Sequence, residues 1–369
     1  MNEFTLKTKI VFGDNAISEL QNLSESKFFI IADPYIVSGG MINTITGQLK
    51  EKDFRVFSEI VPDPPLETVA QGIKEISEYK PQCVIAVGGG SAIDTAKAIL
   101  FYGDSKNIRF IAVPTTSGTG SEVTSFSVIT DKSKGIKYPL VSDEMIPDTA
   151  ILEVDFVKTV PQKIVADTGI DVLTHAIEAY VSVKATDFSD AFAEKAIRIV
   201  RENLLKSYSG DKAAKEKMHT ASLMAGLAFN SASLGLNHAI AHNIGARLHI
   251  PHGRANGILL PQVIKFNSGI ADYTSTDYNE CAVRYAQIAK LFGIDGGNIK
   301  ILVKGLVRET EKLMKAMGMP LSLKEAGTEC SKETAELIAD GAISDNCIKT
   351  NPQKASKADI LKIIDSIRG

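Results

Sequence analysis

Four of the six histidines in this chain, His238, His242, His249 and His252, fall within a stretch of fifteen residues. Histidine is the commonest protein ligand for transition metals and the usual side chain for proton transfer near neutral pH. His238 and His242 are four residues apart, so on a helix they would share one face, one turn apart. Such clustering in a histidine-poor chain predicts a metal or proton-transfer site around residues 238–252.

Asp171 and His175 form a second pair with the same four-residue spacing, in sequence of helical periodicity. One aspartate with several histidines suits Fe(II), Zn(II) or another borderline divalent cation. Three or four protein ligands with one position left for substrate is the catalytic arrangement. Taken alone, however, the pair fits a solvated helix face better than a ligand pair. His219 and His249 lack such neighbours, and we expect both to be structural.

Gly88, Gly89 and Gly90 join a buried strand over residues 83–87 to a helix over 92–101. Residues without side chains let backbone N–H groups approach an anion, and the following helix adds the positive end of its dipole. The three glycines are consecutive, which differs from the G-x-G-x-x-G dinucleotide pattern. The alternative is a turn that needs glycine only for tight packing of strand against helix.

Asp33 follows another buried strand, over residues 28–32. A carboxylate at such a strand end can bind a ribose diol and would repel a 2′-phosphate. In an ordinary dinucleotide fold this acid follows the glycine turn by about twenty residues, whereas Asp33 precedes Gly88 by 88 − 33 = 55 residues. Asp33 therefore belongs either to a differently connected dinucleotide domain or to a turn before Pro34. The Ser/Thr/Gly-rich segment 114–122, after a strand over 109–113, is either a ligand loop or a polar surface loop.

The elements that would carry these residues divide the chain into two parts. Up to residue 160, short β-rich runs alternate with helices of about ten residues, which predicts parallel βαβ units. Beyond Pro161 the periodicity is helical. The expected helices cover residues 163–183, 189–208, 213–232, 240–248, 278–292 and 300–317.

The composition excludes several classes of protein. Net charge is −3, so no basic excess points to nucleic acid. No apolar run approaches the roughly 18 residues of a membrane span, and the first ten residues carry charges where a secretory segment would be apolar. The four cysteines are far apart, which disfavours a disulfide framework or a zinc ribbon. We therefore expect a cytoplasmic globular protein that binds neither membrane nor nucleic acid.

Four segments closely resemble the iron-containing (group III) alcohol dehydrogenases. They are the GGGSAID turn from Gly88, the PTTSGTGSEVT loop from Pro114, the GIDVLTHAIEAY helix from Gly169 and the LGLNHAIAHNIGARLHIPHG stretch from Leu234. Within that family the likeness is greatest to the 1-propanol dehydrogenases of bacterial propanediol utilisation, through the segments MNEFTLKTKI, SEIVPDPP, KGIKYPL, ATDFSDAFAEKA and KTNPQKA. The resemblance implies an α/β, Rossmann-like (dehydroquinate synthase-like) NAD-binding domain over residues 1–160. It also implies an all-helical metal-binding, catalytic domain over residues 161–369.

The resemblance implies that Asp171, His175, His238 and His252 coordinate the metal. Fe(II) is the expected ion, and Zn(II) suits the same ligands. His242 lies one helical turn beyond His238, at the position of a histidine beside the nicotinamide that relays protons in the family. We therefore expect His242 to be the catalytic proton-transfer residue.

The resemblance also implies an NAD site, with Asp33 at the adenosine ribose. The remaining expected contacts are Gly89, Gly90, Ser91 and Asp94 at the pyrophosphate, Thr115 and Thr116 near the adenosine, and Val128 and Lys137 along the nicotinamide half. Asp63 stands where relatives often carry Asn at the cofactor, and a carboxylate there loses a donor and adds negative charge. Phe126, Phe229 and Cys347 match positions that line the substrate pocket, although core packing would explain them nearly as well.

The implied reaction interconverts a short-chain primary alcohol and its aldehyde, with 1-propanol and propionaldehyde expected first. The metal would activate the substrate oxygen while the nicotinamide exchanges a hydride, in a cleft between the two domains. Ethanol, butanol or a 1,2-diol with lactaldehyde as its partner are alternatives within the family. Glycerol dehydrogenases and dehydroquinate synthase-like enzymes also combine NAD, a metal and two such domains. A dehydroquinate synthase would need more basic residues in the cleft to bind its charged substrate. A metal hydrolase and a non-catalytic sensor fit less well, because the metal and cofactor elements are both complete.

Partners follow from the resemblance alone. It implies a homodimer, and the propanediol likeness implies a bacterial microcompartment with shell or aldehyde dehydrogenase partners. The N-terminus begins directly with strand-like sequence and shows no spare targeting helix, which weighs against encapsulation.

Overall fold

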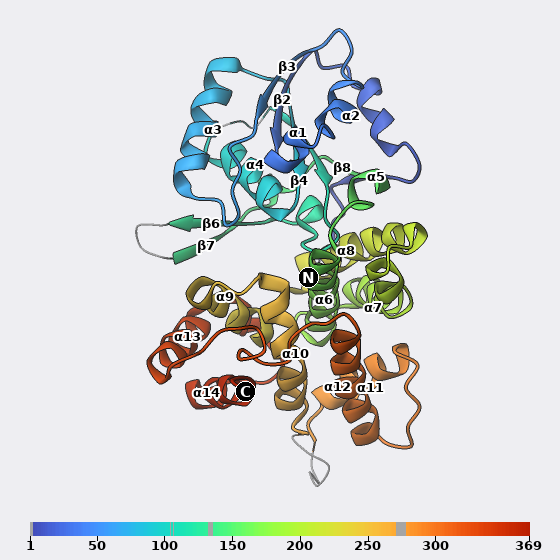
Figure 1. Ribbon diagram of the computed structural model, residues 1–369, viewed down its shortest axis with the longest axis vertical. Helices are drawn as coiled ribbons and strands as arrows, with labels where there is room; N and C mark the ends of the chain where they lie inside the picture. The colour runs from blue at the N-terminus through green and yellow to red at the C-terminus, as the bar shows by residue number, and fades with distance from the viewer. Residues whose placement is uncertain (1–2, 104, 106, 132–135, 271–277) are drawn as a thin grey trace. The chain divides into compact units, whose positions relative to one another are not determined.

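The computed structural model describes residues 3–103, 105, 107–131, 136–270 and 278–369. The chain divides into two compact units, Met1–Val160 and Pro161–Gly369. The first unit contains a parallel sheet flanked by helices, and the second consists of helices (Figure 1).

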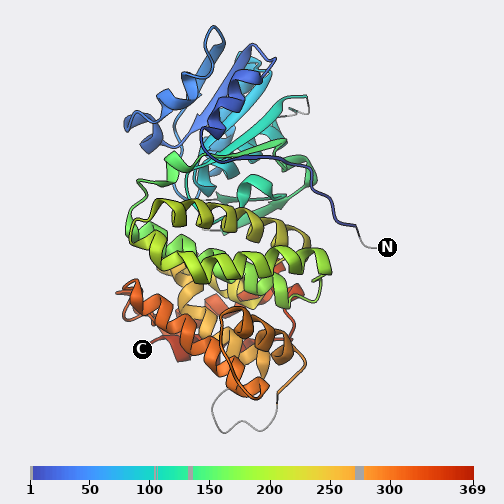
Figure 2. The same ribbon diagram turned by 90° about the vertical axis from the view of Figure 1, so that its right-hand side faces the viewer.

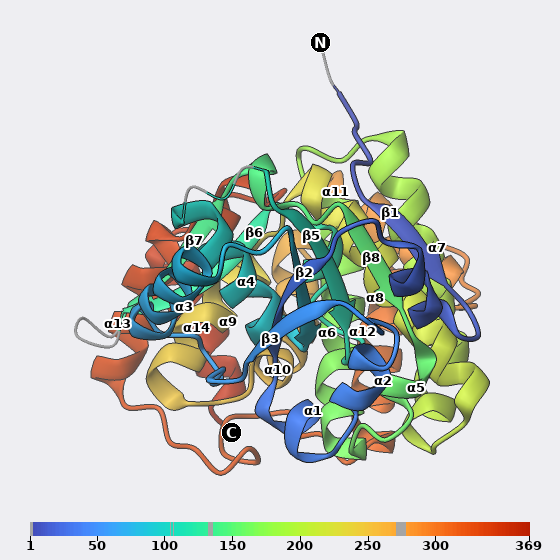
Figure 3. The ribbon, with the colours of Figure 1, turned by 90° about the horizontal axis from the view of Figure 1, so that it is seen from above.

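The sheet of the first unit has six parallel strands in the order β1-β8-β5-β4-β2-β3. Figure 3 labels these strands except β4. Because every strand runs in the same direction, all of their carboxyl ends lie at one edge of the sheet. The strands are β1 (Lys9–Phe12), β2 (Lys27–Ala32), β3 (Asp53–Phe57), β4 (Cys83–Gly88), β5 (Arg109–Pro114) and β8 (Thr149–Leu152).

Both faces of this sheet are buried, as expected for a parallel sheet. Phe28 and Ile30 of β2 pack into one hydrophobic core, whereas Phe29 and Ile31 pack into the other. The covering helices are α1 (Pro34–Ser38), α2 (Ile42–Thr46), α3 (Leu66–Tyr79), α4 (Gly90–Tyr102), α5 (Val154–Val157) and the short 3₁₀ segments η1 (Ala16–Asn22), η2 (Ser121–Val123) and η3 (Asp143–Met145). The continuous apolar runs in β2 and β4 follow from this double coverage.

An antiparallel hairpin, β6 (Phe126–Asp131) and β7 (Ile136–Val141), lies outside the main sheet. This hairpin was not predicted, because the sequence pattern indicated only parallel units. The backbone N–H of Thr130 donates to the carbonyl of Pro64 at 2.8 Å. The hairpin is thereby attached to the loop that carries Asp63.

The second unit contains nine α-helices among the residues that the structure describes. They are α6 (Gln162–Val181), α7 (Asp187–Tyr208), α8 (Lys212–Ala232), α9 (Leu236–Leu248), α10 (His252–Ser268), α11 (Cys281–Leu291), α12 (Ile299–Ala316), α13 (Lys332–Ser344) and α14 (Lys357–Ile367), with the 3₁₀ segment η4 (Asn346–Thr350) before α14. Figure 2 shows α6, α7 and α8 packed side by side. No helix in the described part of the chain is long and apolar enough to cross a membrane.

Helices α10, α13 and α14 were not predicted from the sequence, and α9 begins four residues before the expected start at residue 240. Helix α10 contains Pro261, which normally argues against a helix interior. The burial of most of α10, against α6, α9 and α12 among others, overrides that local preference.

Candidate metal centre and nucleotide site

Three helices of the second unit bring the four predicted metal ligands together. Helix α6 carries Asp171 and His175, α9 carries His238, and α10 begins with His252. One ligand atom from each of the four lies within 4.8 Å of the others. Residues up to 81 positions apart in the sequence therefore lie in one cluster.

The close approach of α10 to α6 depends on a missing side chain. A Cβ atom on Gly253 would lie 2.0 Å from the backbone oxygen of Asp167 and 3.2 Å from Cβ of Asp171. Any larger residue would push the first turn of α10 away from α6. Next to Gly253, Arg254 forms two hydrogen bonds to the Asp167 carboxylate, at 2.8 and 3.1 Å, which hold the two helices in this position.

The ligand atoms point at one place. Asp171 Oδ1 lies 3.6 Å from His252 Nε2 and 3.8 Å from His238 Nε2. Ligands at about 2.1 Å from a tetrahedral cation would be about 3.4 Å apart. A single amide nitrogen, Nδ2 of Asn256, lies 2.7 Å from Asp171 Oδ1, 3.0 Å from His238 Nε2 and 3.1 Å from His252 Nε2. One carboxylate and three imidazoles whose ligand atoms lie within 4.8 Å of one another form a donor set that fits a divalent iron or zinc ion.

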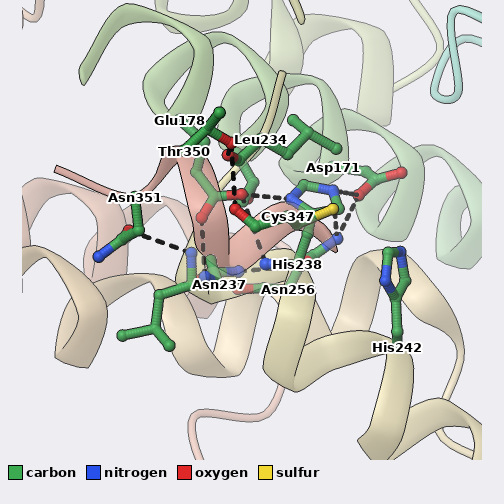
Figure 4. A network of polar contacts seen from close by, with 12 residues as sticks. Asp171, Glu178, Leu234, Asn237, His238, His242, Asn256, Cys347, Thr350 and Asn351 are labelled. Atoms are coloured by element: carbon green, nitrogen blue, oxygen red, sulfur yellow. Dashed lines mark hydrogen bonds and ion pairs between the residues drawn. The ribbon is translucent and has the colours of Figure 1, made fainter. Parts of the chain in front are cut away.

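A carboxylate behind this cluster orients one of the ligands. Glu178 Oε2 lies 2.5 Å from Nδ1 of His238, and Oε1 accepts the backbone N–H of Asn237 at 2.7 Å (Figure 4). Because Nδ1 faces the carboxylate, Nε2 of His238 is directed toward Asp171. Carboxylate–histidine pairs of this kind fix the tautomer and the orientation of metal-binding imidazoles.

Burial shapes the charges of the cluster. Asp171, His175 and His238 are buried, whereas the His252 side chain is 40% exposed. Burial opposes ionisation of Asp171, but the neighbouring histidines outweigh it and lower the pKa of Asp171 below its usual range. Burial likewise opposes protonation of His238, but Asp171 and Glu178 raise the pKa of His238 to about 9. A metal bound here would have to displace the second proton of the His238 imidazole, which the carboxylates of Asp171 and Glu178 stabilise.

His242 lies beside the four-ligand cluster without belonging to it. Its ring stacks on that of His252 at 5.3 Å, and its Nδ1 lies 2.9 Å from Oδ2 of Asp345. In Figure 4 it stands apart from the network of dashed lines. Burial opposes ionisation of Asp345, but hydrogen bonds from His242 and the backbone of Cys347 outweigh it and lower the pKa of Asp345. The carboxylate is therefore an ionised hydrogen-bond acceptor, and Nδ1 of His242 is the donor to it.

Two of the three predicted pocket residues lie in the second unit, near this cluster. The ring of Phe229 is 4.6 Å from the ring of His175, and Cys347 lies within 4.8 Å of His242 through its sulfur atom. Phe126 is in β6 of the first unit, where its carbonyl accepts a hydrogen bond from Lys97. The other two histidines lie elsewhere: His219 is buried in α8, and His249 ends α9 in a left-handed conformation.

The first unit gathers the predicted nucleotide residues at the carboxyl edge of its sheet. Strands β2 and β4 are neighbours, and the backbone N–H of Asp33 donates to the carbonyl of Val87 at 2.9 Å. Strand β5 lies on the other side of β4, and the N–H of Thr115 donates to the carbonyl of Gly88 at 2.9 Å. Asp33 and Gly88, 55 residues apart in the sequence, thus lie next to each other in the fold. The strand order, rather than the order along the chain, places the acid beside the glycine turn.

The glycine turn has a packing role at Gly88, and its anion-binding role stays a prediction. A Cβ atom on Gly88 would lie 2.6 Å from Cβ of Ala92 and 3.1 Å from Cβ of Asp33, so this glycine is needed for packing. Gly89 precedes the first residue of α4, whose N-terminal N–H groups can receive an anion. Ser91 lies in that first turn, and Thr116 is the nearest side chain to Gly89.

Other residues expected at the nucleotide shape its surroundings. Oxygens of Asp94 accept hydrogen bonds from Ser121 Oγ at 2.7 Å and from the N–H of Val128 at 3.0 Å, so Asp94 ties the Ser/Thr/Gly loop to β6. Asp63 adopts a left-handed conformation with φ of 54°, which Asn and Asp tolerate better than most residues. The side chain of Lys137 lies outside the described residues.

Three residues of the metal region, Glu178, Asn256 and Asp345, were not predicted from the sequence. Glu178 follows Asp171 by seven residues and His175 by three, so helical spacing could have placed it on the ligand face. Asn256 follows His252 by four residues, which is the same signal. Asp345 is more than one hundred residues from His242, and no local pattern connects them.

Comparisons with known proteins cover both units. Residues 7–154 match the family model described as iron-containing alcohol dehydrogenase, and residues 165–368 match the Fe-containing alcohol dehydrogenase family, C-terminal. The chain is 41% identical to the 1-propanol dehydrogenase PduQ of Salmonella typhimurium strain LT2, over 100% of both chains. It is 40% identical to an NADPH-dependent butanol dehydrogenase of Clostridium saccharobutylicum, over 100% of this chain and 98% of the relative.

A solved structure of similar fold extends the comparison. The structure of a 1,3-propanediol oxidoreductase superposes with a TM-score of 0.92 at 30% identity, covering 100% of both chains. The parallel sheet followed by a helical unit is thus an arrangement already seen in an experimental structure.

Proposed function

This chain belongs to the iron-containing alcohol dehydrogenase family, and from that premise we propose that it interconverts 1-propanol and propionaldehyde with NAD(H). The family model is described as iron-containing, and a sulfoacetaldehyde reductase of similar fold from Bifidobacterium kashiwanohense was solved in complex with NAD+. The observation that carries the proposal is the cluster of Asp171, His175, His238 and His252, whose ligand atoms lie within 4.8 Å of one another. We assign these four residues as the metal ligands.

A divalent iron ion held there would act as a Lewis acid on the alcohol oxygen, while the nicotinamide accepts the hydride. Glu178 holds the imidazole of His238 in the orientation that presents Nε2. Asn237 donates to Oδ1 of Asn256 at 2.9 Å and thereby turns the Nδ2 group of Asn256 toward the ligands. The 40% exposure of His252 leaves one side of the cluster open for a small substrate.

His242 is the proton-transfer residue of this proposal. Asp345 accepts a hydrogen bond from the protonated Nδ1 of His242. This leaves Nε2 as the ring atom that can take the alcohol proton. The His242 side chain is 28% exposed, so a proton on Nε2 can exchange with solvent. This division of roles between the two ring nitrogens is the one that a carboxylate partner usually imposes on a histidine.

The choice of NAD over NADP rests on Asp33. Asp33 caps the start of α1, where one of its oxygens accepts a hydrogen bond from the N–H of Tyr35 at 2.9 Å. This hydrogen bond holds the carboxylate at the end of β2, beside the glycine turn. A fixed negative charge there favours a ribose diol and repels a 2′-phosphate. The 40% identical butanol dehydrogenase is NADPH-dependent, so overall similarity alone does not decide the cofactor.

The choice of a three-carbon substrate rests on the 41% identical 1-propanol dehydrogenase. Ethanol, butanol and 1,2-diol substrates are the alternatives within the family, and butanol has a relative of nearly equal identity. The homodimer and the microcompartment with aldehyde dehydrogenase partners belong to the same proposal. Their support is the likeness to the propanediol enzymes, and light scattering and copurification would test them.

A substrate panel tests the proposal directly. The protein, loaded with Fe(II) under anaerobic conditions, is assayed for NADH-dependent reduction of acetaldehyde, propionaldehyde, butyraldehyde and lactaldehyde. We expect the highest kcat/KM for propionaldehyde. A higher value for butyraldehyde or lactaldehyde would reassign the substrate, and no reduction of any aldehyde by the iron-loaded protein would refute the activity.

A further inference from the structure

A second group of metal-binding side chains lies next to the four-ligand cluster. It consists of His242 on α9 and of Asp345 and Cys347 at the start of η4. One nitrogen, one oxygen and the sulfur of these residues lie within 4.8 Å of one another. The proposed reaction uses His242 and Asp345 for proton transfer, but it gives no role to the sulfur atom of Cys347.

The three side chains are held in place by the fold. Asp345 Oδ1 accepts the backbone N–H of Cys347 at 2.8 Å, and Oδ2 faces His242 Nδ1 at 2.9 Å. Cys347 packs against the hydrophobic core formed by α9, α10, α13 and α14. His242 and Asp345 are 28% and 15% exposed, so an ion from solvent can reach them. A cation would therefore meet ligands that are already positioned.

The chemistry of this group differs from that of the first cluster. Asp171, His175, His238 and His252 supply only nitrogen and oxygen, which suit Fe(II). The second group adds a sulfur ligand, and thiolates favour zinc and other soft cations. Its carboxylate and thiolate would together balance the charge of a divalent ion. Three protein ligands with a water in the fourth position form a common zinc site.

We propose that His242, Asp345 and Cys347 form a second cation site, which takes a thiophilic divalent ion such as zinc or cadmium and inhibits turnover when it is filled. Inhibition follows because the ion occupies the proton-transfer residue. A cation on the His242–Asp345 pair replaces the hydrogen bond that leaves Nε2 ready to accept the alcohol proton. The inhibition rests on the proposed function, whereas the binding does not.

Protons must leave when the ion binds. Burial, together with the nearby Asp345 charge, raises the pKa of the Cys347 thiol well above its ordinary value, so without a cation the sulfur is protonated. Binding releases that thiol proton to solvent. The proton on His242 Nδ1 passes through solvent to Nε2, so the ring stays neutral while Nδ1 presents its lone pair to the ion. Asp345 exchanges its hydrogen bond for the ion.

Cadmium titration of the iron-loaded protein tests the proposal, because a bound thiolate produces an ultraviolet charge-transfer band. The four-ligand cluster has no sulfur and cannot produce this band. We expect the band to saturate at one equivalent with the iron retained, and NADH-dependent aldehyde reduction to fall in parallel. Cys347→Ser should weaken cadmium binding by more than the roughly 10-fold to 100-fold that loss of an outer metal partner costs. Cys330→Ser, which removes another partly buried cysteine of the helical unit, should leave the band unchanged.

Each contrary result overturns a stated part of the proposal. Absence of the band, or a band of equal strength in Cys347→Ser, overturns the site. Loss of activity without the band shows that cadmium has replaced iron at the first cluster, and this also overturns it. A band without loss of activity overturns the inhibition. Asp345→Asn provides a second variant should Cys347→Ser unfold, and the band is measurable even if the protein reduces no aldehyde.

Discussion

Replacing Glu178 by glutamine is the sharpest test of how the metal centre is built. The Glu178 carboxylate lies 2.5 Å from His238 Nδ1, 2.7 Å from the N–H of Asn237 and 3.4 Å from the N–H of His238. All three partners are donors toward a group that only accepts. Glutamine has the same shape but only one oxygen, so its NH₂ group must face at least one of these donors.

The expected loss follows from these contacts. Removing a carboxylate that orients a metal-binding imidazole typically weakens metal affinity by about 10-fold to 100-fold. This corresponds to about 1.4–2.7 kcal/mol of binding free energy. The buried donor that loses its acceptor should separately destabilise the metal-free protein by about 1–3 kcal/mol. The two effects are measurable independently.

Metal affinity is measured by anaerobic competition for Fe(II) between the metal-free protein and a chelator, under conditions where the variant is folded. Urea unfolding of the metal-free protein gives the stability term. Glu194→Gln is the matched control, because Glu194 is a partly buried carboxylate of the neighbouring α7 that hydrogen-bonds Tyr180 at 3.2 Å and lies outside the ligand cluster. It should leave the metal affinity unchanged.

Unchanged iron affinity in a folded Glu178→Gln protein would refute the assignment of Glu178 as the group that orients His238. In that case Glu178 would serve only to secure the start of α9. An equal loss of affinity in Glu194→Gln would show that the effect of charge is not specific to this contact.

Three further predictions follow from the two units. Asp33→Gly should raise kcat/KM with NADPH relative to NADH, and an original protein that already uses both equally well would contradict the role of Asp33. Chelation should abolish turnover while NADH binding, followed by nicotinamide fluorescence, persists; full activity after verified metal removal would contradict the metal dependence. Burial raises the pKa of Glu122 from 4.5 to about 7, so the folded protein keeps a proton that the unfolded chain releases, and the free energy of unfolding falls as pH rises through this range. In Glu122→Gln the free energy of unfolding should fall by about 3 kcal/mol less over this pH range than in the original protein. Urea unfolding near pH 5 and pH 8 measures the difference, and an unchanged pH profile would count against it.

Helical spacing accounts for how much of the metal centre was predictable. Asp171 and His175 are one turn apart on α6, and a four-residue step on a helix always returns to the same face. The same rule leads from His238 to His242. The alternative interpretation, a solvated helix face, failed for Asp171 and His175 because both are buried. Burial depends on which helices pack against α6, and spacing along one helix does not contain that information.

The elements that were missed show the same limit. Helix α10 contains a proline and begins with glycine-containing sequence, so local preferences argued against it. Its burial between α6 and α9 stabilises it regardless. The β6–β7 hairpin was missed because an antiparallel pair outside the main sheet has no place in a pattern of alternating strands and helices.

The sequence by itself determined that the first unit alternates strands and helices and that the second is helical. It also determined the family and which residues share a helix face. Each of these depends on residues a few positions apart. Tertiary structure decided which distant residues meet. Asp33 reaches Gly88 because β2 and β4 are adjacent in the sheet, and Glu178 reaches His238 because α6 packs beside the start of α9. Asp345 reaches His242 across 103 positions of the chain. Such contacts depend on how side chains fill the space between elements, and that is a property of the whole packed unit.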